Sequence, residues 1–293
     1  MLSQAAWAAP SDAGGELPVT VIIPSKRGRE CVDDAIGSVL AQEGVGNEII
    51  VVLDDCTAAR ADWIEQQYRD HPSVRFVRHA ARSASASRNL GLRSARHAWV
   101  AFLDDDDIMR AGRLQQMLSA AVAQRARWVV SDAERFDVTT GRSRRQHASG
   151  VDLRHLLVSN VVPGGGSGVV AQRQLVLDVG GFDERLRNSE DWDLWIRLAT
   201  IGPPASVRNV TLVRRVSSAG KGGAVFGSLQ AFGWIVWKYR SLRRQSGVRV
   251  DILAYVRWIF RRQRARLCAW SAERVDKTYP CFLTDKRTTK RHR

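Results

Sequence analysis

Residues 99–107 read Trp-Val-Ala-Phe-Leu-Asp-Asp-Asp-Asp, an apolar run followed at once by four carboxylates. A short apolar run of this kind is typical of a buried strand, so the four acids should lie together at its end. Like charges repel one another, and a hard divalent cation held by oxygen ligands is the usual counter-charge. For the DDDD run alone, an acidic solvated turn explains the pattern equally well. The surrounding sequence must distinguish such a turn from a metal site.

Further apolar runs are found on both sides of this segment, and segments with helical spacing of apolar residues separate them. The predicted strands are 19–23, 48–53, 74–77, 99–103 and 128–130. Alternation of strands and helices predicts an α/β fold with a parallel, doubly wound sheet. Ligands of such sheets bind at the carboxyl ends of the strands. Asp54 and Asp55 end the strand at 48–53, so two acidic strand ends should face one crevice.

Two later segments carry further signals. Residues 162–168, Val-Pro-Gly-Gly-Gly-Ser-Gly, lack the Lys-Ser/Thr of a P-loop, and the sequence therefore predicts a mobile loop rather than a phosphate cradle. Residues 189–198, Ser-Glu-Asp-Trp-Asp-Leu-Trp-Ile-Arg-Leu, open a helix. Ser189 could cap this helix, and Glu190 and Asp191 could simply favour its dipole.

The net charge of +15 is concentrated at the end of the chain. From Lys238 onward there are 17 Lys and Arg against 4 Asp and Glu, so the preceding part is nearly neutral. The four cysteines form no CxxC pair, which is typical of reduced thiols in a cytosolic protein. No apolar run reaches the roughly 18 residues that a membrane span needs. Residues 1–17 indicate a flexible leader without the basic region of a signal peptide.

Taken in order, six motifs resemble those of the family-2 glycosyltransferases of the GT-A fold. They are the Pro-Ser that ends the first strand, LDDCT, SRNLGL, FLDDDD, GGFDE and EDWDLWIRL. The resemblance covers about 18–216. It implies a GT-A domain over 18–220, with a nucleotide-sugar half at about 18–130 and an acceptor half at about 131–220. The basic helical extension at 221–293 would follow.

The family resemblance implies transfer, usually with inversion, from a nucleotide-diphosphate sugar to a hydroxyl acceptor with Mg²⁺ or Mn²⁺. The expected setting is bacterial cell-surface glycan or glycolipid assembly. The residues implied in donor binding are Pro24, Ser25, Asp55, Arg88, Asp104 and Asp105. The implied metal site is Asp106 with Asp104 and Asp107. Asp191 is implied as the general base, with Glu190 beside it near the acceptor.

These residue types suit that chemistry. A cation stabilises the negative charge that builds on a diphosphate leaving group, and a positioned carboxylate takes the proton of the attacking hydroxyl. Two positions depart from the family pattern, since Lys26-Arg27 replaces Tyr-Asn and Asp54-Asp55-Cys56-Thr57 replaces DDGS. Both departures touch the nucleotide pocket, so the donor base stays open, with a UDP-sugar favoured. No run long enough to span a membrane is found, which argues against a processive synthase.

Two other classes are weighed against this reading. A sugar-nucleotidyltransferase would need a Gly-rich loop after the first strand, of which residues 25–29, Ser-Lys-Arg-Gly-Arg, are a thin version. A non-catalytic protein could use the basic tail to bind nucleic acid or membrane. The presence of carboxylates at all three sites disfavours a catalytically inactive domain.

In the tail, basic residues alternate with Trp and Phe around 226–264, which suits an anionic membrane surface and a lipid-linked acceptor. Packing of the apolar faces on the catalytic domain explains the pattern equally well. The expected location is cytoplasmic, with peripheral contact at the inner face of the plasma membrane as one option.

Overall fold

A computed structural model of the chain describes residues 18–251 except 27, 29–30, 81–82 and 218–223. The expected leader at 1–17 and the part of the extension beyond Asp251 lie outside the described residues. The strands are β1 (Val19–Lys26), β2 (Asn47–Asp54), β3 (Val74–His79), β4 (Trp99–Phe102), β5 (Ile108–Met109), β6 (Trp128–Asp137), β7 (Ser143–Gln146), β8 (Val169–Gln172) and β9 (Ala205–Val216). The helices are α1 (Val32–Leu40), α2 (Ala58–Gln67), α3 (Ala84–Ser94), α4 (Arg113–Gln124), α5 (Leu153–Leu156), η1 (Gly165–Gly168), α6 (Arg173–Asp178), α7 (Glu190–Ile201), α8 (Ala224–Lys238) and α9 (Arg240–Gln245).

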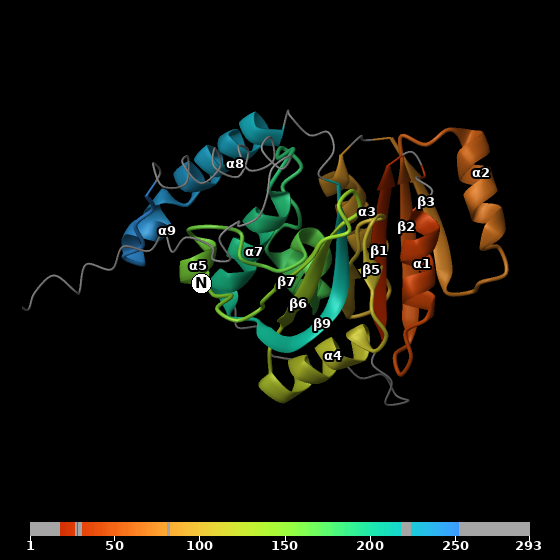
Figure 1. Cartoon of the computed structure of the whole chain (residues 1–293), viewed down its shortest axis with the longest axis horizontal. Helices are drawn as coiled ribbons and strands as arrows, with labels where there is room; N and C mark the ends of the chain where they lie inside the picture. Colours follow the sequence, from red (N-terminus) through yellow and green to blue (C-terminus); the bar gives the residue numbers. More distant parts are fainter. Residues whose placement is uncertain (1–17, 27, 29–30, 81–82, 218–223, 252–293) are drawn as a thin grey trace, which may run out of the picture.

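The first half of the chain forms the parallel sheet that the sequence predicts. Its strands lie in the order β3-β2-β1-β4, all parallel, with helices in the connections (Figure 1). Buried apolar side chains fill β1, β2 and β4 almost completely, as expected for strands covered on both faces. The carboxyl ends of β1, β2 and β4 therefore meet at one edge, where the acidic residues follow them.

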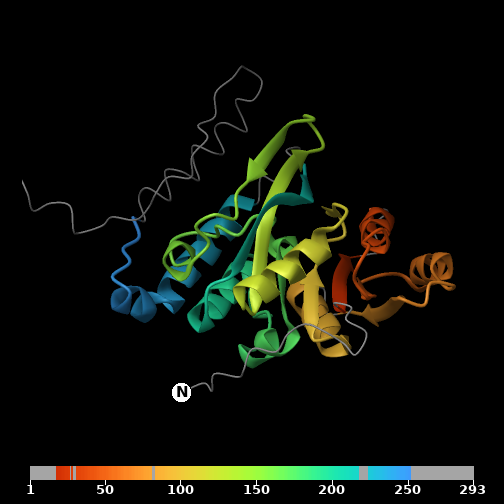
Figure 2. The same ribbon diagram turned by 90° about the horizontal axis from the view of Figure 1, so that it is seen from below.

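The second half of the sheet is mixed, so the sheet as a whole is mostly parallel, as expected for a GT-A fold. β8 lies between β4 and β6 and runs antiparallel to both, whereas β6 and β9 are parallel. The direction of β8 has a simple cause, because η1 delivers the chain to it at the same edge as the acidic residues. Figure 2 shows the β6–β7 hairpin projecting from the sheet beside the end of β9.

Two apolar cores cover the two faces of this sheet. One contains buried residues of α3, α5, α6, α7 and α8, and the other contains those of α1, α2 and α4. Alternate residues of a strand serve opposite cores, as Ile22 and Ile23 of β1 do. The α/β class is confirmed by this arrangement.

The described part of the basic extension packs on the rest of the chain. Phe232, Ile235 and Tyr239 are buried in the same core as α7, and the rings of Phe232 and Trp192 stack with centroids 6.2 Å apart. Arg243 is buried as well and donates a hydrogen bond to the carbonyl of Leu157 at 2.6 Å. Packing on the domain is thus confirmed for α8 and α9. Within the described ranges, every helix is too short or too polar to cross a membrane.

Candidate active site

The buried side chain of Arg88 links the carboxylates that follow β4 to the start of α7. Arg88, on α3, donates to Asp104 Oδ1 at 2.5 Å and to Glu190 Oε1 at 2.9 Å. Its guanidinium is almost fully buried, and although burial opposes its charge, the two carboxylates raise the pKa of Arg88 above its usual value. Burial would raise the pKa of Asp104, but Arg88 outweighs it and lowers that pKa. Residues of three distant segments are therefore held at one point.

Asp191 lies beside this ion-paired group and is held by neutral donors. Its Oδ1 accepts the backbone N–H of Trp192 at 2.7 Å, and its Oδ2 accepts the amide of Asn160 at 3.1 Å. Burial and the adjacent charge of Glu190 raise the pKa of Asp191 to about 6. A carboxylate with a pKa near neutrality is suited to accept a proton from a hydroxyl.

The backbone at the start of α7 differs from the expected cap. Ser189 has a positive φ of 63° and its side chain makes no capping hydrogen bond, so the prediction of a Ser189 cap is wrong. The Asp191 carboxylate itself accepts a first-turn N–H instead. The acids of this turn are thus oriented toward the strand ends rather than serving only the helix dipole.

The glycine-rich segment is a buried turn, not the mobile loop that the sequence predicts. Gly165, Gly166 and Ser167 are all buried in η1. A Cβ on Gly166 would lie 3.1 Å from a terminal nitrogen of Arg88. A Cβ on Gly165 would lie 3.2 Å from Asp191 Oδ2 and 3.3 Å from a terminal nitrogen of Arg214. The glycines are needed because the backbone passes between the charged groups of the site.

Ser167 and the backbone of Arg215 hold the last carboxylate of the DDDD run. Ser167 donates to Asp107 Oδ2 at 2.6 Å and accepts the N–H of Asp104 at 3.0 Å, while the N–H of Arg215 donates to Asp107 Oδ1 at 3.0 Å. Burial and the charge of Asp104 raise the pKa of Asp107. Arg113, fully buried, donates to the carbonyl of Ser167 at 2.8 Å, and burial lowers its pKa to about 9. Hydrogen bonds to both carboxylate oxygens therefore fix Asp107 in place beneath the site.

The expected donor residues lie at the neighbouring strand ends. Ser25, near the end of β1, donates to Asp105 Oδ2 at 2.8 Å, and Pro24 precedes it in the strand. Asp55 follows β2 with a positive φ of 54°. Asp54, just before it, is buried and accepts the N–H of Ser83 at 2.9 Å, which ties β2 to the start of α3. Two strand ends and α3 thus form one wall.

The arrangement fits a hard divalent cation only in part. In the described segments, no three acidic, His or Cys side chains are already gathered as a metal cluster. Asp106 is half-buried and Asp104 is beside it, so these two offer the carboxylate oxygens that Mg²⁺ or Mn²⁺ prefers. Both oxygens of Asp107 already accept hydrogen bonds. A cation here would take few protein ligands and complete its shell with phosphate oxygens and water, as Mg²⁺ commonly does.

Arg214 and Ser167 are two residues that sequence reasoning misses. Arg214 of β9 has electrostatic interactions with Asp104, Asp107 and Asp191. It lies in β9, more than 100 positions from Asp104 in the sequence. No local sequence pattern identifies it as a residue of the site. Ser167 carries a weak signal, as the one hydroxyl within the glycine-rich run.

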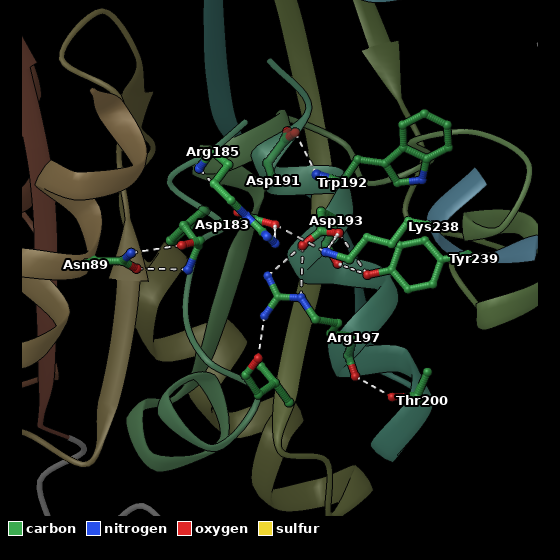
Figure 3. A network of polar contacts seen from close by, with 12 residues as sticks. Asn89, Asp183, Arg185, Asp191, Trp192, Asp193, Arg197, Thr200, Lys238 and Tyr239 are labelled. Carbon is green, nitrogen blue, oxygen red and sulfur yellow. Dashed lines mark hydrogen bonds and ion pairs between the residues drawn. The ribbon is translucent and has the colours of Figure 1, made fainter. Parts of the chain in front are cut away.

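A second polar network fixes α7 from behind (Figure 3). Asp193 is fully buried and accepts from Lys238 Nζ at 2.6 Å, Tyr239 Oη at 2.8 Å and Arg197 Nε at 2.9 Å. Lys238 also reaches Asp183 at 3.3 Å. The extension therefore anchors the first turn of the helix that carries Asp191.

Asn89 of α3 joins the same region from the other side. Its amide donates to the carbonyl of Phe182 at 2.8 Å and accepts the N–H of that residue at 2.8 Å. A Cβ on Gly181 would lie 2.6 Å from Asn89 Oδ1, so this position needs glycine. The SRNLGL and GGFDE motifs are thus two sides of one contact.

A sheet with acidic strand ends facing a helix-borne carboxylate defines a GT-A type of fold, and solved structures agree. The structure of Staphylococcus aureus TarS 1-349 in complex with UDP-GlcNAc superposes with a TM-score of 0.62 at 16% identity, covering 75% of this chain and 64% of that one. A mannosyltransferase, PcManGT from Pyrobaculum calidifontis in complex with GDP-Man and Mn²⁺, gives 0.55 at 16% identity and covers 76% and 64%. The GT-A prediction is confirmed.

The family model described as "Glycosyl transferase family 2" matches residues 20–178, more than half of the chain, and the protein belongs to that family. The succinoglycan biosynthesis protein ExoO of Rhizobium meliloti is 32% identical over 190 residues, which cover 60% of this chain and 54% of that protein. The pre-mycofactocin glycosyltransferase of Mycobacterium tuberculosis is 29% identical over 209 residues, covering 67% and 42%. The chain spans about half the length of such relatives.

Proposed function

We propose that the protein transfers a sugar, with inversion, from a nucleotide-diphosphate donor to a hydroxyl group of a bacterial glycan or glycolipid acceptor. The observation that carries this proposal is the position of Asp191, a half-buried carboxylate with a pKa of about 6, beside η1 and close to the carboxylates that follow β4. Family membership supports it, as do the printed names of relatives in succinoglycan and pre-mycofactocin synthesis.

In this proposal Asp191 takes the proton of the attacking hydroxyl as the new glycosidic bond forms. The bond between the anomeric carbon and the donor diphosphate breaks on the opposite face, so one displacement inverts the configuration. Asn160 and the N–H of Trp192 orient the two oxygens of Asp191. Glu190, held by Arg88, keeps the pKa of Asp191 high enough for proton transfer near neutral pH.

On the donor side, Ser25, Asp55 and Asp105 with Pro24 would line the nucleotide, and Arg88 and Asp104 would face its diphosphate. Asp104 and Asp106 would hold Mg²⁺ or Mn²⁺, which supplies positive charge to the departing diphosphate when bound. Asp107 supports that site from below. The Mn²⁺ in the PcManGT complex is consistent with this assignment. A UDP-sugar is the favoured donor, in keeping with the UDP-GlcNAc complex of TarS.

The proposal is tested by screening nucleotide sugars for release of nucleoside diphosphate with Mn²⁺, with Mg²⁺ and with EDTA. The expected result is metal-dependent release from one donor class. Asp106→Asn should abolish release while the melting temperature stays near that of the wild type, and Asp70→Asn, an exposed acid beyond α2, is the matched control. Equal release with EDTA and Mn²⁺ would overturn the metal assignment, and no release from any donor would overturn the transferase.

Contact of the extension with an anionic membrane stays a separate proposal. In α8, Trp237 is 61% exposed, and the Arg240 guanidinium lies over its ring at 4.7 Å, an aromatic and basic pair that suits a headgroup region. Because a truncation before Lys238 would also remove Tyr239 and Arg243, which pack on the domain, the informative change is Trp237→Ala with Arg240→Gln. Salt-sensitive sedimentation with anionic but not neutral liposomes is expected for the full chain. Equal recovery in both supernatants would end this idea.

A further inference from the structure

Arg113 is a cation that lies entirely inside the domain, next to the turn η1. It is the first residue of α4 and is 0% exposed. Its guanidinium donates to Ser131 Oγ of β6 at 2.7 Å, to Thr211 Oγ1 of β9 at 2.6 Å and to the carbonyl of Ser167 in η1 at 2.8 Å. One side chain therefore connects a helix, two strands and the turn that borders the reaction centre.

The hydrogen-bond partners of Arg113 are all neutral. Arginine is rarely fully buried unless an anion is paired with it, because a buried charge loses its hydration. In the part of the chain that the structure describes, no carboxylate forms an ion pair with Arg113, and its Nε has no hydrogen-bond partner. Burial lowers the pKa of Arg113 to about 9, and the charge of Asp107 opposes that shift. Arg113 is therefore a cation at neutral pH that interacts electrostatically with an acid of the site.

Packing of the core does not require a cation at this place. The hydroxyl groups of Ser131 and Thr211 also hydrogen-bond to each other at 2.7 Å, so neither depends on Arg113 for a partner. An apolar side chain of similar volume in place of a buried charge often leaves stability unchanged or raises it. The arginine is therefore better explained by what it holds than by the stability it adds.

Ser167 connects Arg113 to the carboxylates that follow β4. While the carbonyl of Ser167 accepts from Arg113, its hydroxyl donates to Asp107 Oδ2 at 2.6 Å and accepts the N–H of Asp104 at 3.0 Å. The two glycines before Ser167 pass between the other charged groups of the site. A displacement of Ser167 would therefore move the DDDD run and these glycines together.

We propose that Arg113 is a positioning residue of the transferase, which holds Ser167 and, through it, the carboxylates of the DDDD run in place for the donor diphosphate and its cation. Residues that orient the ligands of a metal typically change metal affinity or activity by roughly 10–100-fold when they are replaced. Arg113 is buried behind η1, so it acts through Ser167 and not by contact with the donor. This inference rests on the proposed transferase function and adds a residue to its donor site.

Arg243 is a second buried arginine and offers a matched control. It is 5% exposed and donates to the carbonyls of Leu157 at 2.6 Å and Val236 at 2.7 Å. Among the described residues no carboxylate pairs with Arg243, and burial lowers its pKa to about 10. Replacement of either arginine removes a buried cation with neutral partners, but only Arg113 is linked to the DDDD run.

The test measures the Kd of UDP with Mn²⁺ by calorimetry for the wild type, Arg113→Met, Arg113→Lys and Arg243→Met. Methionine removes the donors of the side chain, whereas lysine keeps the charge and serves where the methionine variant does not fold. We expect Kd to rise ~10-fold in Arg113→Met and less in Arg113→Lys, as for other residues that orient metal ligands. Arg243→Met should leave Kd unchanged even where its melting temperature falls. Loss of folded protein lowers the number of binding sites and not their Kd, so the measurement separates positioning from core support.

Ser167→Ala tests the route of the effect. If Arg113 acts through Ser167, a variant with both changes should bind UDP about as weakly as the weaker single variant, because the two residues form one network. Additive losses would contradict this route. An unchanged Kd in the Arg113 variants, or an equal rise in Arg243→Met, would overturn the proposal and leave the transferase untouched. Donor hydrolysis by the wild type, measured in parallel, tests the transferase itself, and a wild type that binds none of UDP, GDP and dTDP would reject the donor site as a whole.

Discussion

Two sides of the first turn of α7 carry the same residue in opposite settings. Asp191 faces η1, where neutral donors hold it and the charge of Glu190 stands beside it. Asp193, two residues later and fully buried, faces the extension, where Lys238, Arg197 and Tyr239 surround it. In our proposal the first carboxylate accepts a proton, whereas the second holds two segments of the chain together. The hydrogen-bond donors of Asp191 are neutral, whereas charged Lys238 and Arg197 donate to Asp193, and this difference separates the proposed base from the structural acid.

Replacing the two residues one at a time should give opposite results. Asp191→Asn should lower kcat by ~10²-fold or more, since general-base catalysis contributes about that much, with donor binding and melting temperature near the wild type. Steady-state kinetics and calorimetry with nucleoside diphosphate check this. A variant that keeps kcat but loses donor affinity would place Asp191 on the donor side instead.

Asp193→Asn should act mainly on stability. Removal of one partner from a buried ion pair typically costs about 3 kcal/mol, and this change would leave Arg197 without Asp193 and Lys238 with only its longer contact to Asp183. Urea unfolding measures this, with Asp178→Asn as the control, since Asp178 is a more exposed acid that accepts from Gln174 at 2.7 Å. The control should stay within about 0.5 kcal/mol of the wild type. Equal unfolding midpoints for both variants would mean that the extension does not fix α7.

Much of this comparison is readable from the sequence, and some of it is not. The strand ends at Asp54 and Asp104 follow from apolar runs, because a buried parallel strand carries its pattern locally. Asp193 could not be separated from Asp191 in this way, since Lys238 and Tyr239 are 45 and 46 positions further along. The glycine-rich segment predicted a mobile loop. Its glycines are instead needed because the side chains of Arg88 and Asp191, which are distant in sequence, lie too close for a Cβ atom.

The close approach at η1 offers a more moderate perturbation of the Asp191 side. Gly166→Ala places a methyl group 3.1 Å from Arg88, which must then shift against Asp104 and Glu190. We expect kcat/KM to fall by ~10-fold, since small displacements of positioned groups have effects of this order or larger. Gly37→Ala, in α1 with open space around it, is the matched control. Equal activity of the two variants would show that Arg88 tolerates displacement.

The smallest expected effect is on pH dependence. With a pKa of about 6 for Asp191, kcat/KM should fall below pH 6 as the base becomes protonated, and should level off above it. Glu190→Gln removes a negative charge that raises this pKa, so the acidic limb should move to lower pH. Glu43→Gln, exposed after α1, should leave the limb in place. A limb that stays unmoved in Glu190→Gln would assign it to another group.

The contact between α7 and α8 also bears on how the chain matures and on where it can be cut. During synthesis α7 leaves the ribosome well before Lys238 and Tyr239, so Asp193 has only Arg197 of its own helix as a cationic partner until the extension has emerged. A fragment that stops at residue 178, where the family model ends, would lack α7 and both of its acids. One that stops at 220 would keep Asp191 but leave Asp193 without Lys238. The shortest piece expected to fold with its base in position therefore runs through α9.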